Sequence, residues 1–244
     1  MTTIDRLERD LLYNSNDPVY VGDVPIYPVT IREIRRMGYA HYKTLLGIIC
    51  LTSNDIGAIL KESSEDAGVP LYFLISILEY NENQRADILE AFWMVCHEDP
   101  SWNFDTMEIY AGGGVLTSEN FTEFQRVVKE RNKVPGDAAD DENPADEYTR
   151  RLLAKSRAIE EKKAKQRGDD EGVTLADLIS ICAAKLQVHP DCIGDYDMYQ
   201  LNDVLGRFKI FDDYETNINA LLHGAKKEDI DLQHWISGNQ SLFK

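Results

Sequence analysis

The spacing of apolar residues divides the chain into two helical regions with a polar region between them. Apolar side chains recur at intervals of three and four over much of residues 30–131 and again over 173–222, which predicts amphipathic helices. Residues 136–172 hold few apolar positions and many charged ones. The pattern predicts a mainly α fold: an N-terminal helical module at 1–135, a charged linker or connector at 136–172, flexible or partly helical, and a small C-terminal α-helical module at 173–244.

A β-type signal precedes the first long helix. Residues 19–29 are rich in β-branched and aromatic residues, and Gly22-Asp23 in their midst is typical of a two-residue hairpin turn. Pro25 and Pro28 have no N–H group, which confines the second strand to an edge. We therefore expect one small β-hairpin in the N-terminal module.

Capping signals mark several helix starts. A Ser, Thr or Asp that precedes an apolar-periodic run, with an acidic or amide residue three positions later, satisfies the first N–H groups of a helix. We expect an irregularity at Gly38 or Gly47, and separate helices around Leu201–Phe208 and Phe211–Leu222. The predicted starts are Thr30 with Glu33, Thr52 to Asp55, Thr117 or Ser118, Thr174 with Asp177, and Asp195 to Asp197.

A glycine triplet lies in a segment whose structure is harder to predict. Gly112-Gly113-Gly114 resembles a phosphate-binding loop only superficially, because Val115-Leu116 stands where such loops carry Lys and Ser or Thr. The triplet therefore predicts a flexible turn rather than a nucleotide site.

The charge balance limits the partners that the chain can bind. Its formal net charge is −17 and its isoelectric point is about 4.7, which argues against binding nucleic acid or an anionic membrane. An acidic DNA mimic or inhibitor that binds a basic host protein is kept as an alternative function. The sequence shows no signal peptide and no apolar run of membrane-spanning length, so we expect a cytoplasmic protein.

No arrangement of residues points to catalysis or to a cofactor. The four cysteines are scattered without a CxxC pair, which is the usage of a reducing compartment. His189 and Cys192 form one loose pair, whereas structural zinc sites need two tight ones. Acidic pairs such as Asp212-Asp213 are explained by helix starts. We therefore expect that the protein is not an enzyme and that it binds no cofactor and no metal.

Two segments contain apolar residues that a partner protein could bind. The C-terminal tail either folds back to close the small module or acts as a partner-binding peptide, since exposed Trp and Leu are frequent interface anchors. The connector contains a thin apolar line on a helix-forming stretch. The candidate partner-binding residues are Leu232, Trp235 and Ile236 in the tail and Tyr148, Leu152 and Ile159 in the connector.

Several soft motifs together resemble one protein family. The run Tyr27–Ile34, after a short hairpin and before a helical module, resembles the N-terminal module of tail assembly chaperones from long-tailed bacteriophages of Gram-positive hosts. Asp195–Tyr199 and Leu221–Ala225, followed by Leu232 and Trp235, are similar to their C-terminal module. The resemblance covers most of the chain and fits the long form with both modules.

The resemblance implies a non-enzymatic role in viral tail assembly. Such chaperones bind the tape measure protein, keep it soluble and recruit tail tube protein subunits around it in the host cytoplasm, and they are not retained in the virion. The expected partners are therefore the tape measure protein and the tail tube protein, with no nucleic acid and no membrane; self-association stays open. Whether the chain arises by frameshift fusion or from one gene also stays open.

Overall fold

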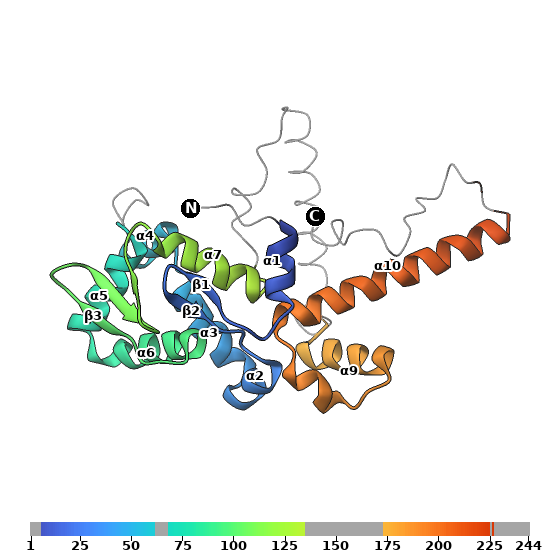
Figure 1. Ribbon diagram of the computed structural model, residues 1–244, viewed down its shortest axis with the longest axis horizontal. Helices are drawn as coiled ribbons and strands as arrows, with labels where there is room; N and C mark the ends of the chain where they lie inside the picture. Colours follow the sequence, from blue (N-terminus) through green and yellow to red (C-terminus); the bar gives the residue numbers. More distant parts are fainter. Residues whose placement is uncertain (1–5, 62–67, 135–172, 225, 227–244) are drawn as a thin grey trace. The chain divides into compact units, whose positions relative to one another are not determined.

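The computed structural model describes residues 6–61, 68–134, 173–224 and 226. These fall into two compact units, one formed by the described parts of 1–134 and 193–244 and the other by 173–192. The fold is mainly α, as the apolar pattern predicts. In the first unit (Figure 1) the elements are α1 (Arg6–Tyr13), β1 (Val19–Val21), β2 (Val24–Ile26), α2 (Ile31–Met37), α3 (Tyr39–Ile49), α4 (Ser53–Leu60), α5 (Pro70–Tyr80), α6 (Glu82–Cys96), β3 (Ser101–Asn103), β4 (Glu108–Ala111), β5 (Gly114–Leu116), α7 (Phe121–Arg131) and α10 (Met198–Leu222).

The N-terminal hairpin forms as predicted. Strands β1 and β2 pair antiparallel with Val21 opposite Val24, so Gly22 and Asp23 make the two-residue turn. The capping boxes at Thr30 and Thr52 are both present. The cap predicted at Thr117 or Ser118 is wrong, because α7 begins after Asn120. The predicted irregularity lies at Gly38, whose φ of 89° separates α2 from α3.

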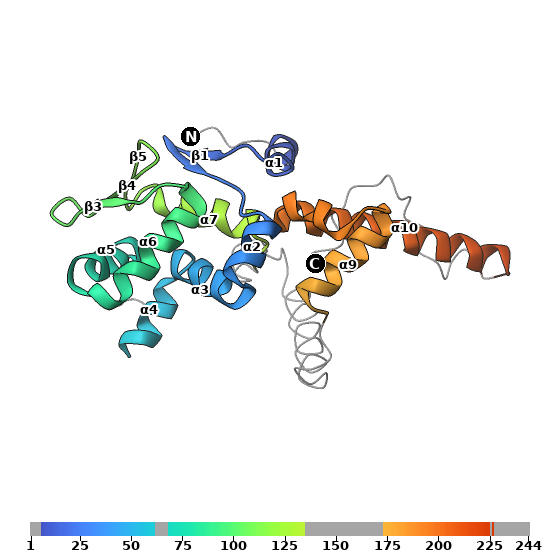
Figure 2. The same cartoon turned by 90° about the horizontal axis from the view of Figure 1, so that it is seen from below.

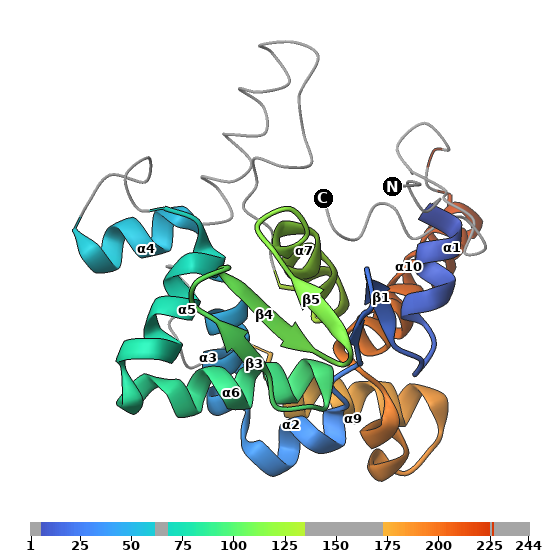
Figure 3. The same cartoon turned by 60° about the vertical axis from the view of Figure 1, so that its left-hand side comes forward.

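A three-stranded sheet was not predicted. Strands β3, β4 and β5 pair antiparallel in that order, and the turn between β4 and β5 is made by Gly112 and Gly113, both with positive φ. The glycine triplet is thus a hairpin turn, and β5 lies beside the β1–β2 ribbon (Figure 3). Each of these strands holds only one or two β-branched or aromatic residues, whereas all three residues of β1 are of these types, so the β signal in the sequence is weaker here.

The core of this unit is built on α6 and α7. Helix α6 packs against both α3 and α5 (Figure 2). Its Phe92 ring stacks on Phe124 of α7 at 5.9 Å between ring centroids, and Phe124 stacks in turn on Phe121 at 5.8 Å. All three rings are buried, and each burial of this size contributes about 1.5–3 kcal/mol.

The C-terminal helical residues of this unit form one helix where two were expected. Helix α10 runs unbroken over the 25 residues Met198–Leu222. The pair Asp212-Asp213, interpreted above as a helix start, lies in mid-helix with both side chains exposed. Because the exposed carboxylates remain hydrated, nothing forces the helix to begin again there. None of the four buried residues of α10 lies beyond its central residue, Ile210.

The second unit contains α9 (Leu175–Leu186), which begins with the predicted capping box of Thr174 and Asp177. A 3-10 helix, η1 (Pro190–Asp195), crosses the boundary between the units.

Among the described helices of both units, none alone is long and apolar enough to cross a membrane. Helices α3 and α4 pass that test only as a pair, with a bend of 99° between them.

Candidate functional site

The six residues predicted to bind a partner cannot be placed in the fold. Leu232, Trp235 and Ile236 of the tail and Tyr148, Leu152 and Ile159 of the connector all lie outside the described residues. Their role stays a prediction. The described residues instead contain a polar site that the sequence analysis missed.

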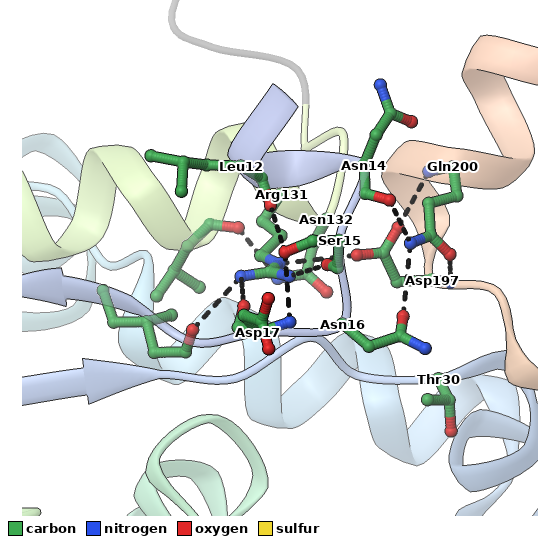
Figure 4. A network of polar contacts seen from close by, with 12 residues as sticks. Leu12, Asn14, Ser15, Asn16, Asp17, Thr30, Arg131, Asn132, Asp197 and Gln200 are labelled. Carbon is green, nitrogen blue, oxygen red and sulfur yellow. Dashed lines mark hydrogen bonds and ion pairs between the residues drawn. The ribbon is translucent and has the colours of Figure 1, made fainter. Parts of the chain in front are cut away.

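This site centres on Arg131 in the last turn of α7, whose side chain is only 1% exposed. Its guanidinium Nη2 donates to the carbonyl of Ser15 at 2.6 Å, and Nη1 donates to the carbonyls of Asp17 at 3.0 Å and Ile26 at 3.3 Å. Nε donates to the Asp197 carboxylate at 3.4 Å. Figure 4 shows the guanidinium between the loop that follows α1 and the start of α10.

Asp197 is the N-cap of α10 and is as buried as its cation, with a side chain 1% exposed. Its Oδ1 accepts from the backbone N–H of Gln200 at 2.8 Å, while its own N–H donates to Oε1 of Gln200 at 3.1 Å. The Gln200 amide then donates to Asn14 and Asn16. One carboxylate thus caps a helix and neutralises a buried cation at the same time. We call Asn14, Ser15, Asn16, Asp17, Arg131, Asp197 and Gln200 the buried junction, after the buried pair Arg131 and Asp197 at its centre.

Neighbouring contacts hold the same two chain segments together. The N–H of Ile31 donates to the carbonyl of Tyr196 at 2.7 Å. The hydroxyl of Tyr199 donates to Asp10 at 2.8 Å, its ring meets Tyr13 edge-on, and Lys133 lies 3.8 Å from its centroid. Residues 10–17 and α7 are therefore joined to the start of α10 by side-chain and aromatic contacts, and the start of α2 is joined to Tyr196 by a backbone hydrogen bond.

Burial dominates the electrostatics of the pair. It raises the pKa of Asp197 above the ordinary carboxyl value, against the opposing effects of the Gln200 amide and the Arg131 charge. It also lowers the pKa of Arg131, against the attraction of Asp197. Each charge is therefore costly to bury and depends on the other for compensation.

The contacts of the junction position chain segments relative to one another within the first unit. Sequence reasoning identified the helix start at Asp195–Asp197 but attached no meaning to Arg131, because a cation in the last turn of a helix is ordinarily explained by the helix dipole. The sequence does hold one sign that Arg131 is buried. It lies in the apolar stripe of α7, at helical spacing after Phe124, Val127 and Val128.

A reactive cysteine and a metal site each place their own requirements on the described residues. Cys50, Cys96 and Cys182 are buried, and Cys192 is exposed. Burial raises the pKa of Cys50 to about 11 and that of Cys96 to about 12, so both thiols remain protonated at neutral pH. Within the described ranges, no group of three or more His, Cys, Asp or Glu side chains is placed to hold a metal ion.

Several large apolar side chains are exposed and are candidates for protein contacts. They come from α1, the hairpin, α4, α5, α6, α9 and the second half of α10. The most exposed are Leu11, Tyr20, Ile59, Tyr80, Trp93, Val173 and Leu222, each at least half accessible.

Comparison with known proteins gives one match. Residues 162–239 match the family described as YomV second domain, a phage-type protein family. The matched stretch contains α9, η1 and α10 and is about a third of the chain. No curated protein and no solved structure matches the chain.

Proposed function

We propose that this protein is a non-enzymatic tail assembly chaperone of a long-tailed bacteriophage. In this role it binds the tape measure protein, keeps it soluble in the host cytoplasm and recruits tail tube subunits, without remaining in the virion.

The observation that carries the proposal is the match of residues 162–239 to a domain of a phage-type protein family. It falls on the C-terminal part of the chain, where Asp195–Tyr199 and Leu221–Ala225 resemble tail assembly chaperones. The match gives the phage context, and the resemblance gives the specific role.

The physical properties of the chain suit such a role. A tape measure protein carries long apolar helical faces that aggregate until the tube covers them. A chaperone with a net charge of −17 remains soluble, and its exposed apolar side chains offer many weak contacts. Repetition of such contacts along one elongated target raises the overall affinity without any strong single site.

The first experiment is co-expression with the tape measure protein of the same phage. We expect the tape measure protein to move from the insoluble to the soluble fraction and to co-purify with the chaperone. A tape measure protein that stays insoluble, or that is soluble but never co-purifies, would overturn the proposal.

A second experiment separates the two partners. We propose that 1–135 coats the tape measure protein and that 173–244 recruits tube subunits. The triple variant Leu232→Ala, Trp235→Ala, Ile236→Ala changes the tail and retains the buried junction. It should retain tape measure solubilisation and lose tube recruitment. Gln233→Ala with Asn239→Ala is the matched control in the same segment and should recruit tube subunits normally.

A further inference from the structure

Three ring-bearing side chains form a continuous surface at the C-terminal end of α6. The Tyr27 and His97 rings stack with centroids 4.4 Å apart and an interplanar angle of 7°. The Trp93 ring lies 6.0 Å from that of His97, tilted by 36°. Trp93 and His97 are exposed and Tyr27 is partly exposed, with half of the Trp93 surface accessible. We call these three residues the aromatic surface.

Backbone geometry holds the aromatic surface in place. The N–H of Tyr27 donates to the carbonyl of Val95 at 2.7 Å, which fixes the segment after β2 beside α6. His97 ends α6 in the left-handed conformation, with φ of 56°, and its N–H donates to the carbonyl of Trp93 at 2.8 Å. The rings are thus presented by a helix end and its cap, and little reorganisation is needed to bind a partner.

Acidic residues precede Trp93 and follow His97 along the chain. Glu90 lies one helical turn before Trp93, with its side chain 48% exposed and 2.9 Å from His41. Glu98 and Asp99 follow His97 directly and are both exposed. Carboxylates beside an aromatic face favour a cation, because the face itself carries a partial negative charge.

Elsewhere the protein supplies cations to its own rings. Arg85 lies 5.6 Å from the Trp102 centroid, Lys43 lies 5.7 Å from that of Tyr39, and Lys133 covers Tyr199. Among the described residues, no lysine or arginine lies over Trp93 in this way.

We propose that the aromatic surface of Tyr27, Trp93 and His97 is a docking site for an arginine-bearing segment of a partner protein. The guanidinium stacks on the exposed Trp93 face, and the neighbouring carboxylates, Glu90 first, balance its charge. A planar guanidinium suits this geometry better than an ammonium because it can stack and hydrogen-bond at once. The inference does not depend on the proposed chaperone function.

The test is an NMR titration of the full-length protein labelled with ¹⁵N. The chain has three tryptophans, at 93, 102 and 235, whose indole N–H signals are assigned by substitution with phenylalanine. The probes are the acetylated, amidated peptides Gly-Arg-Gly-Gly-Arg-Gly and its citrulline analogue, which keeps the shape without the charge. We expect the Arg peptide to shift the Trp93 signal saturably and the citrulline peptide to leave it unchanged.

Internal and matched controls make the result specific. Trp102 already faces Arg85, so its indole signal should not move. Glu90→Gln should weaken Arg-peptide binding by about two- to fivefold, the range for an exposed charge pair. Tyr80→Ala, which removes an exposed ring elsewhere, should bind like the unaltered protein.

Three outcomes would overturn the inference. One is no shift of the Trp93 signal at the highest soluble peptide concentration. Another is a Trp93 shift with the citrulline peptide that is as large as the shift with the Arg peptide. An Arg-peptide shift at Trp102 as large as the one at Trp93 would count in the same way. The third is a Trp93 response to phosphatidylcholine vesicles and not to the Arg peptide, which would assign the surface to a membrane.

Discussion

The side chain of Arg131 illustrates how strongly one buried charge can depend on one partner. Three backbone carbonyls accept from its Nη1 and Nη2 groups, and among the described residues only Asp197 supplies negative charge within hydrogen-bond distance. Removing one member of a buried pair leaves the other charge uncompensated, which costs far more than the intact pair contributes.

We therefore predict that Asp197→Ala lowers the free energy of unfolding by about 3–5 kcal/mol. The loss combines an uncompensated guanidinium with a missing cap on α10, and urea denaturation measures it. Asp195→Ala is the matched control two residues away. Its salt bridge with Arg32 is largely solvated, with side chains 70% and 42% exposed, so its loss should cost at most about 1 kcal/mol. Equal losses for the two variants would show that the pair has no special role.

A second prediction at this scale concerns the capping box of α4. The Thr52 hydroxyl and backbone N–H both donate to Asp55 and lower its pKa. Because the folded pKa lies below the unfolded one, this stabilisation is present above the unfolded pKa of about 3.9 and is lost as pH falls through the folded value. Thr52→Ala should raise the pKa of Asp55 towards its ordinary value, as measured by carboxyl ¹³C NMR titration. The Asp177 carboxyl, in the box of Thr174, should titrate as before.

The residue scale also shows what the sequence can and cannot reveal. The capping residues at Thr30, Thr52, Thr174 and Asp197 were predicted because each cap is decided within four residues. The pairing of Arg131 with Asp197 joins residues 66 positions apart, and no local pattern records it. The candidate site was missed for that reason, although half of it was recognised as a cap.

At the scale of elements, the glycine triplet shows how a turn is fitted to its neighbours. A Cβ atom on Gly114 would overlap the backbone of Asp23 and Val24, so β5 approaches the β1–β2 turn as closely as it does only because Gly114 has no side chain. Gly113 has a φ of 82° but nothing within 4 Å of where its Cβ would lie.

We predict that Gly114→Ala destabilises the protein by more than about 3 kcal/mol, since backbone on both sides must shift. Gly113→Ala should cost only about 1–2 kcal/mol, the strain of a left-handed residue with a side chain. Thermal unfolding followed by circular dichroism gives both values. If Gly113→Ala proved the more damaging, the close approach of β5 to the hairpin would be contradicted.

The errors at this scale have physical causes too. The three-stranded sheet was missed because its strands hold few β-branched or aromatic residues and its pairing is decided by neighbours outside each strand. Helix α10 was divided because Asp212-Asp213 has the composition of a helix start, and only the continuous helical backbone shows that no cap is needed there. Local composition suggests where a helix can begin, but tertiary context decides whether it does.

For the whole molecule, the first unit is discontinuous in sequence. Residues 193–224 form one compact unit with 6–134, although 135–192 separate them along the chain. The contacts of Tyr196, Asp197, Tyr199 and Gln200 join the two segments within this unit. The covalent connection contributes mainly by keeping the two segments at a high effective concentration.

We predict that cutting this connection leaves the two segments associated. A protease recognition sequence placed at 137–143 would be cleaved after purification, and the two fragments should co-elute from a size-exclusion column at micromolar concentration and separate on dilution. The same cleavage in an Asp197→Ala background should release the fragments at concentrations where the unaltered pair remains together. In that variant the associated fragments would bury Arg131 without its counterion, which weakens their association. Cleavage in an Asp195→Ala background should behave like the unaltered pair. Immediate separation of the unaltered fragments would mean that 193–224 is held by the connection and not by the buried junction.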